Sequence, residues 1–224
     1  MIDFNTLIDQ HIYRESRPKG IGKYYPSSAG TCIRKEWYSF KYPSEIDPKL
    51  RKIFKMGDMI HDFVVEVLKS KKNPEVELLK AELPFRKKID GITISGRVDD
   101  VIQIKSDGQI YLVEVKSTKG LQWTKEPKPH NILQLQLYMH FTGIHNGMLL
   151  YIDKTNLQSR IFEIPYDKQK AESSLDFFKK LDKHLKEDTL PPPQARLNKE
   201  MNWWCNYCEY KERCHKATPR VTKN

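Results

Sequence analysis

Hydrophobic residues recur every three or four positions over long segments of the chain, which is the spacing of an amphipathic helix. This pattern predicts helices over residues 3–16, 49–70, 130–141 and 167–187. One more helix is expected to start at Ser27 or Ser28, whose hydroxyls are suitable N-caps. That helix would carry Cys32, Arg34, Lys35, Trp37 and Phe40.

Alternation of polar and apolar residues with a period of two predicts strands. The predicted strands cover residues 92–104, 111–117, 147–153 and 157–164, and residues 76–88 are expected to begin the sheet. The turn Ser106-Asp107-Gly108-Gln109 joins the first two strands into a hairpin over 92–117. Because helices alternate with strands around this hairpin, we expect an α/β fold with a mixed central sheet flanked by helices.

The strand over 111–117 contains an unusual pair of charges. Tyr111, Val113 and Val115 point to one face, so Leu112, Glu114 and Lys116 point to the other. Burying both ions on a largely apolar face costs several kcal/mol for each unless something compensates. The alternative is an edge strand whose Glu and Lys face water.

The predicted hairpin brings a second carboxylate to this pair. Asp99 lies across from Glu114 and Lys116 in the pattern Asp-x14-Glu-x-Lys, and Asp100 competes with it because a bulge can reverse the alternation. Two converging carboxylates need a cation unless one of them stays protonated, and Mg²⁺ or Mn²⁺ suits oxygen ligands. His61, on the predicted helix over 49–70, is either a further ligand or a structural histidine.

Composition narrows the class of protein. The chain has 224 residues, of which 38% are hydrophobic and 30% are charged, as in a globular protein. The formal net charge of +10 favours a polyanionic partner, although a basic soluble protein without one has the same balance. No apolar run approaches the roughly 18 residues of a membrane span, and the N-terminus lacks the pattern of a signal peptide. We therefore expect a cytoplasmic location, where cysteines are reduced thiols or metal ligands.

Three of the four cysteines form the cluster Cys205-x2-Cys208-x5-Cys214, which is typical of metal ligands. Zinc and cubane clusters usually take a fourth ligand. Cys32 is the remaining cysteine, and His215 is the alternative, which would give a zinc Cys3His site. If Cys32 is the fourth ligand, the cluster closes a very long loop and stabilises the fold.

Four motifs in this order resemble the PD-(D/E)xK nucleases of the RecB type. They are Gly57-x3-His61, Gly96-Arg97-Val98-Asp99, Glu114-Val115-Lys116 and Gln134-x3-Tyr138. The resemblance implies that His61, Asp99, Glu114 and the Val115 carbonyl ligate Mn²⁺ or Mg²⁺, and that Lys116 is the catalytic lysine. Gln134 and Tyr138 would contact DNA or support the site; otherwise they are ordinary helix residues.

The early Cys32 and the late cysteine cluster resemble the CRISPR-associated RecB-like exonucleases (the Cas-four family), apart from Ile33, where relatives often have proline. This resemblance implies a 4Fe–4S cluster, with Arg34 near the cluster and the DNA. It also implies exonuclease activity on single-stranded DNA, often from the 5′ end and sometimes with endonuclease activity. The implied role is trimming DNA before CRISPR spacer acquisition, alongside the integrase proteins. Stand-alone viral or mobile-element versions have the same pattern.

Three regions follow from these interpretations. Residues 1–48 form an N-terminal helical region that contributes Cys32, residues 49–190 form the RecB-like, restriction-endonuclease-like nuclease core, and residues 191–224 form the cluster segment with a basic tail. The competing hypothesis is a binding or assembly module without catalysis. The complete set of His61, Asp99, Glu114 and Lys116 argues against it.

Overall fold

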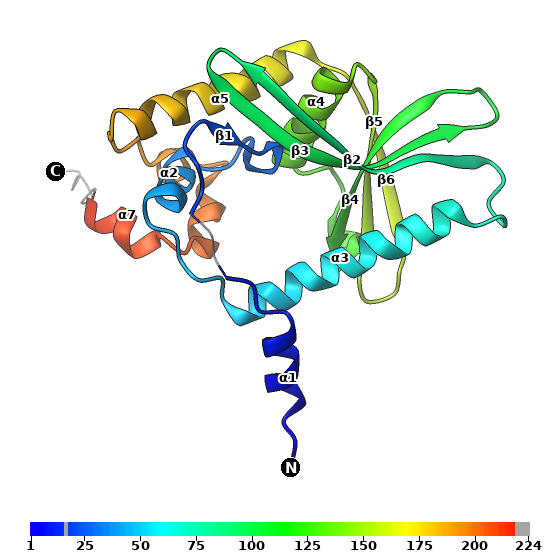
Figure 1. The fold of residues 1–224 in the computed structure, drawn as a ribbon, viewed down its shortest axis with the longest axis horizontal. Coiled ribbons are helices and arrows are strands. Elements are labelled where there is room, and N and C mark those ends of the chain that lie inside the picture. The colour runs from blue at the N-terminus through cyan, green and yellow to red at the C-terminus, as the bar shows by residue number, and fades with distance from the viewer. Residues whose placement is uncertain (16–17, 218–224) are drawn as a thin grey trace.

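The computed structural model describes residues 1–15 and 18–217, in which six strands form one mixed sheet with helices on both faces (Figure 1). The strands are β1 (Lys23–Tyr24), β2 (Val76–Ile89), β3 (Ile92–Ile104), β4 (Ile110–Thr118), β5 (Asn146–Asp153) and β6 (Ser159–Pro165). The α-helices are α1 (Phe4–His11), α2 (Ile33–Lys41), α3 (Pro48–Lys69), α4 (Pro129–Thr142), α5 (Lys168–Lys186), α6 (Gln194–Leu197) and α7 (Lys211–Ala217). Short 3-10 turns are η1 (Pro26–Ser28), η2 (Leu121–Trp123) and η3 (Asn202–Tyr207).

Strand β3 organises the sheet because it has partners on both edges. The antiparallel β2 pairs along its whole length, while the other edge is divided between two strands. The parallel β1 pairs with β3 at Thr93 and Ile94, and the antiparallel β4 pairs with it only from Asp100 to Gln103. Among the described strands, none pairs with residues 95–99 on this edge. The sheet therefore opens beside Asp99.

Strands β4 and β5 are parallel and are joined by helix α4. Their register runs from Leu112 opposite Gly147 to Thr118 opposite Asp153, and β6 then pairs antiparallel with β5. A parallel pair needs a crossover connection of about a dozen or more residues, and α4 provides it. Gly143 ends this helix in the left-handed conformation, with a φ of 76° that favours glycine.

The two faces of the sheet carry different helices (Figure 1). On one face, Ile60 and Val64 of α3 pack with Ile152 and the partly buried Val115. On the other, α4 buries Leu135, Leu137 and Met139 in clusters shared with β3, β4, β5 and α5, which contribute Ile94, Leu112, Leu149 and Phe178. Covering both faces explains why the strands of this sheet are rich in apolar residues.

The structure confirms the α/β fold, the hairpin over 92–117 and the helices from α3 to α5, with small shifts at their ends. It corrects the second helix, which begins at Ile33 with Cys32 as its N-cap residue, while Ser27 and Ser28 lie in η1. A left-handed Gly30, with a φ of 71°, separates the two elements. The first helix ends at His11; residue 16 of that prediction and the tail over 218–224 lie outside the described residues. In the described part of the chain, no helix is long and apolar enough to cross a membrane.

Helix α4 approaches β5 closely at Gly147, which gives a first prediction. A Cβ there would lie 2.8 Å from Leu135 Cδ2 and 3.0 Å from the Met139 sulfur, and both side chains have no exposed surface on which to move. We expect Gly147→Ala to lower the free energy of unfolding by about 1–3 kcal/mol in urea titrations. Gly57→Ala on α3 is the control, since its Cβ meets nothing closer than 3.9 Å and helix propensity favours alanine. Equal effects at the two sites would contradict this account of the helix–sheet contact.

Candidate active site

Glu114 and Lys116 lie under helix α4 rather than in water. Glu114 is 2% exposed, and its Oε1 accepts hydrogen bonds from Lys116 Nζ (2.6 Å) and Gln134 Nε2 (2.7 Å). Lys116 Nζ also donates to Gln134 Oε1 (3.1 Å), and Gln134 Nε2 lies 2.9 Å from the Tyr138 hydroxyl, which accepts from it. The edge-strand alternative is therefore wrong. Gln134 and Tyr138, one helical turn apart, are buried supports of the two charges.

Asp99 is placed by the opening of the sheet. Pairing between β3 and β4 ends at Asp100 and Val113, so the N–H of Val115 has no backbone partner on β3. The Asp99 carboxylate takes that place, because Val115 N donates to Asp99 Oδ2 at 2.8 Å. This contact brings the Asp99 side chain to the strand that carries Glu114 and Lys116. The structure thus gives the Val115 N–H a hydrogen bond to Asp99. Metal ligation by the Val115 carbonyl stays a prediction.

The neighbouring Asp100 faces the opposite helix. It pairs with Val113, whose side chain packs on the α3 face of the sheet, and it is fully buried. His61 Nε2 of α3 lies 3.6 Å from Asp100 Oδ2, which is close for two charges but longer than a hydrogen bond. Strict alternation could not separate the two aspartates. Asp99 contacts β4, the strand that carries Glu114 and Lys116. Asp100 instead lies next to His61 of α3.

Burial and mutual charge interactions shift the pKa values of the ionisable groups in this cluster. Burial, followed by the charge of Asp99, raises the pKa of Glu114 to about 8. Burial also raises the pKa of Asp99, against the opposing Val115 hydrogen bond and Lys116 charge. Burial alone would lower the pKa of Lys116, but Glu114 outweighs it and the net shift is upward. The Asp100 carboxylate raises the pKa of His61 to about 9 despite burial.

The unsatisfied atoms of this cluster fit a cation. Within the described residues, His61 Nε2, both Asp100 oxygens and Glu114 Oε2 are buried without a hydrogen-bond partner. Buried polar atoms are normally paired, and those without a protein partner commonly bind an ion or a water molecule. Carboxylate oxygens with one imidazole suit Mg²⁺ or Mn²⁺. No three metal-binding side chains of residues 1–15 and 18–217 stand at ligand spacing in this conformation, so binding would draw the side chains together.

The four cysteines gather in one pocket although Cys32 is far from the others in sequence. Cys32, Cys205, Cys208 and Cys214 all line it, together with residues that include Arg34 and His215. Cys32 is the N-cap residue of α2, and Cys205 lies in η3. Cys208 directly follows η3, and Cys214 lies in α7. As around Glu114, no three of these described side chains lie close enough together to bind one metal ion in this conformation. Burial raises the pKa of the Cys208 thiol to about 11, so this thiol is neutral near pH 7.

Arg34 is directed into this pocket rather than toward solvent. Its exposed fraction is 5%, its Nε donates to the Pro191 carbonyl at 2.6 Å, and its Nη1 lies 3.8 Å from Cys214 Sγ. The guanidinium therefore ties α2 to the connector before α6 and to α7. The expected proximity of Arg34 to the cysteines agrees with this placement, and a DNA contact stays a prediction.

Comparison with known proteins places this geometry in a family. The profile of the PD-(D/E)XK nuclease superfamily matches residues 10–215. The chain belongs to this superfamily. PD-(D/E)XK nucleases usually use Mg²⁺ or Mn²⁺, which agrees with the donor set around Glu114. No curated protein matches the sequence significantly.

Two solved structures resemble this PD-(D/E)XK nuclease in fold. The crystal structure of SSO0001 is 21% identical over 98% of this chain and 94% of that chain, with a TM-score of 0.60. A phage related exonuclease from Haemophilus somnus 129PT is 11% identical over 83% of this chain and 97% of that chain, with a TM-score of 0.50. At these identities the likeness shows the fold alone.

Sequence reasoning missed the residues that position α4 and the preceding loop. Tyr151 of β5 lies opposite Lys116 and is 1% exposed; its hydroxyl accepts from Asn131 Nδ2 (2.7 Å) and Lys128 N (3.0 Å). Asp153, at the end of β5, accepts from the N–H groups of residues 120 and 121. The strand–helix–strand order over 111–153 was the available signal, since it predicts parallel neighbours.

The proposed ligand set gives a prediction that does not depend on catalysis. Mn²⁺ at about one hundred times its Kd should stabilise the wild type by about 2.7 kcal/mol, measured as a rise in Tm, because only the folded state assembles the site. We expect Asp99→Asn and Glu114→Gln to lose most of this shift. Glu163→Gln, an exposed residue of β6, should keep it. An unchanged shift in Glu114→Gln would contradict the site, and a larger loss in Asp100→Asn than in Asp99→Asn would reverse the assignment of the aspartates.

Proposed function

We propose that this protein is a metal-dependent deoxyribonuclease that hydrolyses phosphodiester bonds at the Asp99–Glu114–Lys116 cluster. The observation that carries the proposal is the buried Glu114–Lys116 pair held by Gln134 beside the opening of β3 and β4. A structural pair would cost desolvation without a return in stability, because buried ion pairs seldom improve on apolar packing. Membership of the PD-(D/E)XK superfamily supports the same function.

The residues of the chain divide the work of hydrolysis. Asp99, Glu114 and His61 would hold Mn²⁺ or Mg²⁺, together with the Val115 carbonyl. When bound, such an ion supplies a more acidic water and neutralises charge on the phosphate. The Lys116 ammonium, kept protonated by Glu114, stabilises the negative charge that develops on the phosphate oxygens. Gln134 fixes the position of Lys116, and Tyr138 fixes Gln134.

The preferred substrate in this proposal is single-stranded DNA or an overhanging end. The formal net charge of +10 supports a polyanionic substrate, whose binding should weaken steeply with salt. The sequence resemblance to RecB-like enzymes supports exonuclease action, from the 5′ end, with endonuclease action as a secondary activity.

The cysteine pocket supports a more specific proposal. Cys32 lines the same pocket as Cys205, Cys208 and Cys214, and this supports a 4Fe–4S cluster with four thiolate ligands. Together with the motif order, it supports assignment to the CRISPR-associated RecB-like exonucleases and a role in trimming DNA before spacer acquisition, with the integrase proteins as partners.

The decisive experiment for the activity is a nuclease assay on end-labelled single-stranded DNA with Mn²⁺ or Mg²⁺. We expect Glu114→Ala and Lys116→Ala to reduce the cleavage rate by at least about a hundred-fold, since the first removes a proposed metal ligand and the second removes the cation at the reacting phosphate. The control Glu163→Ala, on the exposed face of β6, should cleave at the wild-type rate. Cleavage that persists in clean Glu114→Ala protein would exclude this cluster as the active site.

The cofactor proposal is tested by metal analysis of protein purified without oxygen. We expect the wild type to contain iron and acid-labile sulfide and to absorb visible light. Cys32→Ala should lose the iron, the sulfide and the absorption, because one thiolate ligand is missing. His215→Ala should retain the iron. A colourless wild type that contains zinc and loses it in His215→Ala would instead establish a Cys3His zinc site.

A further inference from the structure

The loop between β4 and α4 holds a tryptophan in water on a firmly fixed backbone. Trp123, at the end of η2, is 80% exposed, whereas Leu121 two residues earlier is 6% exposed. Tryptophan has the largest apolar surface of any side chain, and it is usually mostly buried. The described core therefore uses Leu121 to anchor this loop and leaves the indole outside.

Contacts at both ends immobilise this loop. The Asp153 carboxylate accepts from Gly120 N (3.0 Å) and Leu121 N (2.9 Å), and Arg160 Nη1 donates to the Thr124 carbonyl at 2.6 Å. Gly120 has a φ of 83°, and a Cβ on it would lie only 2.9 Å from Trp123 Cδ1. The indole thus lies against a glycine that leaves room for it. A fixed aromatic surface loses little conformational entropy when it binds a flat ligand.

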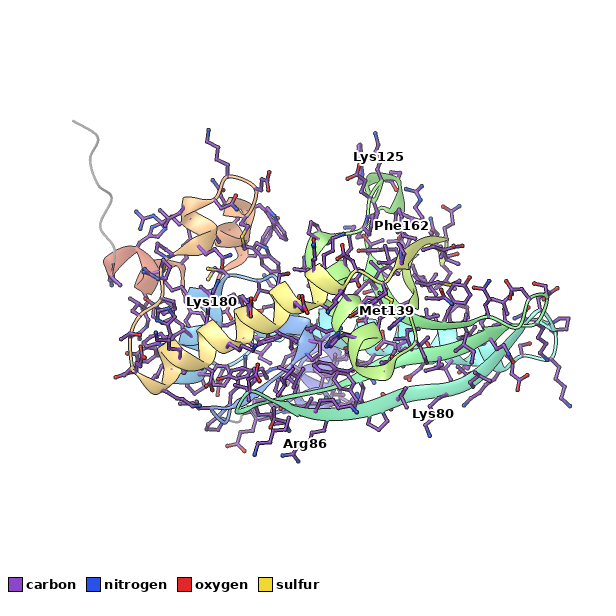
Figure 2. The ribbon with its side chains drawn as sticks, turned by 90° about the horizontal axis from the view of Figure 1, so that it is seen from above. Lys80, Arg86, Lys125, Met139, Phe162 and Lys180 are labelled. Atoms are coloured by element: carbon purple, nitrogen blue, oxygen red, sulfur yellow. The ribbon has the colours of Figure 1, made fainter. Side chains whose placement is uncertain are left out.

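The loop is continuous with the active site and is basic. It begins after Thr118 at the end of β4, the strand that carries Glu114 and Lys116. Lys119, Lys125 and Lys128 are exposed along it, and Figure 2 shows Lys125 at the tip of a projection from the body. The end of the loop lies near Lys116, because Lys128 N donates to the Tyr151 hydroxyl at 3.0 Å and Tyr151 lies opposite Lys116 in the register of β4 with β5.

An exposed indole among lysines has the chemistry of a single-strand contact. Lysines track the phosphate backbone, and an aromatic face stacks on a base of any sequence. Bases in a duplex are already stacked on each other, so only an unpaired base offers its face. We propose that Trp123 is the stacking platform for an unpaired nucleobase of a strand that enters the active site, a subsite that rests on the proposed nuclease function.

Binding measured without divalent metal tests this subsite separately from cleavage. The probes are fluorescent oligothymidylate, the same strand with abasic sites, and a blunt duplex. We expect Trp123→Ala to weaken binding of oligothymidylate by about ten-fold, as for loss of one base stack, and Trp123→Phe to recover most of the affinity. The abasic strand and the duplex should bind Trp123→Ala as they bind the wild type.

Tyr207→Ala is the matched control, because this aromatic side chain is 79% exposed but lies in the cysteine segment. It should bind oligothymidylate like the wild type, and all variants should keep the wild-type Tm. Equal affinity of Trp123→Ala and wild type for oligothymidylate would overturn the subsite and leave the indole as a protein-docking residue. Equal losses on the thymidylate and abasic strands would also overturn it, because the contact would not involve a base.

The outcomes separate this proposal from the nuclease proposal. A wild type that binds oligothymidylate through Trp123 but cleaves no DNA would keep the subsite and refute the activity. A wild type that cleaves DNA with no effect of Trp123→Ala on binding would keep the activity and refute the subsite. A wild type that binds no single strand refutes the subsite directly.

Discussion

The structure depends on the burial of one carboxylate, that of Glu114, between the sheet and helix α4. Taking this charge out of water costs several kcal/mol, and only paired hydrogen bonds can offset it. Lys116 and Gln134 supply them, and Tyr138 then receives the remaining donor of Gln134. This requirement constrains the position of α4, because the helix must lie close enough to deliver the Gln134 amide to a strand residue. Gly147 allows that approach on the neighbouring strand.

The second constraint is the opening of the sheet beside β3. This strand is longer than its pairing with β4, so the backbone N–H of Val115 is left for a side chain. Asp99 accepts from it and becomes a neighbour of Glu114 and Lys116. From the other face, α3 brings His61 to Asp100. Two helices on opposite faces thus contribute to one cluster beside the opening between β3 and β4.

The cysteine pocket is physically connected to this cluster. Trp204, beside Cys205, stacks with Trp203 and packs edge-on against His130, with ring centroids 5.1 Å apart. His130 lies one helical turn before Gln134 on α4. The segment that gathers the cysteines therefore supports the start of the helix whose Gln134 contacts Glu114 and Lys116. A ligand at the cysteines would stabilise this support as well as the connection between the two ends of the chain.

Local patterns predicted most of the helices and strands, the shared face of Glu114 and Lys116, and the family, because periodicity and motif spacing do not depend on distant contacts. The α/β fold and the hairpin follow from such patterns. The sequence could not show which of Asp99 and Asp100 contacts β4, since that contact depends on where the pairing of β3 with β4 ends. It also could not show that Cys32 reaches the other cysteines, or that Tyr151 and Asp153 hold the loop that presents Trp123. These relations join residues far apart in the chain, and only tertiary packing brings them together.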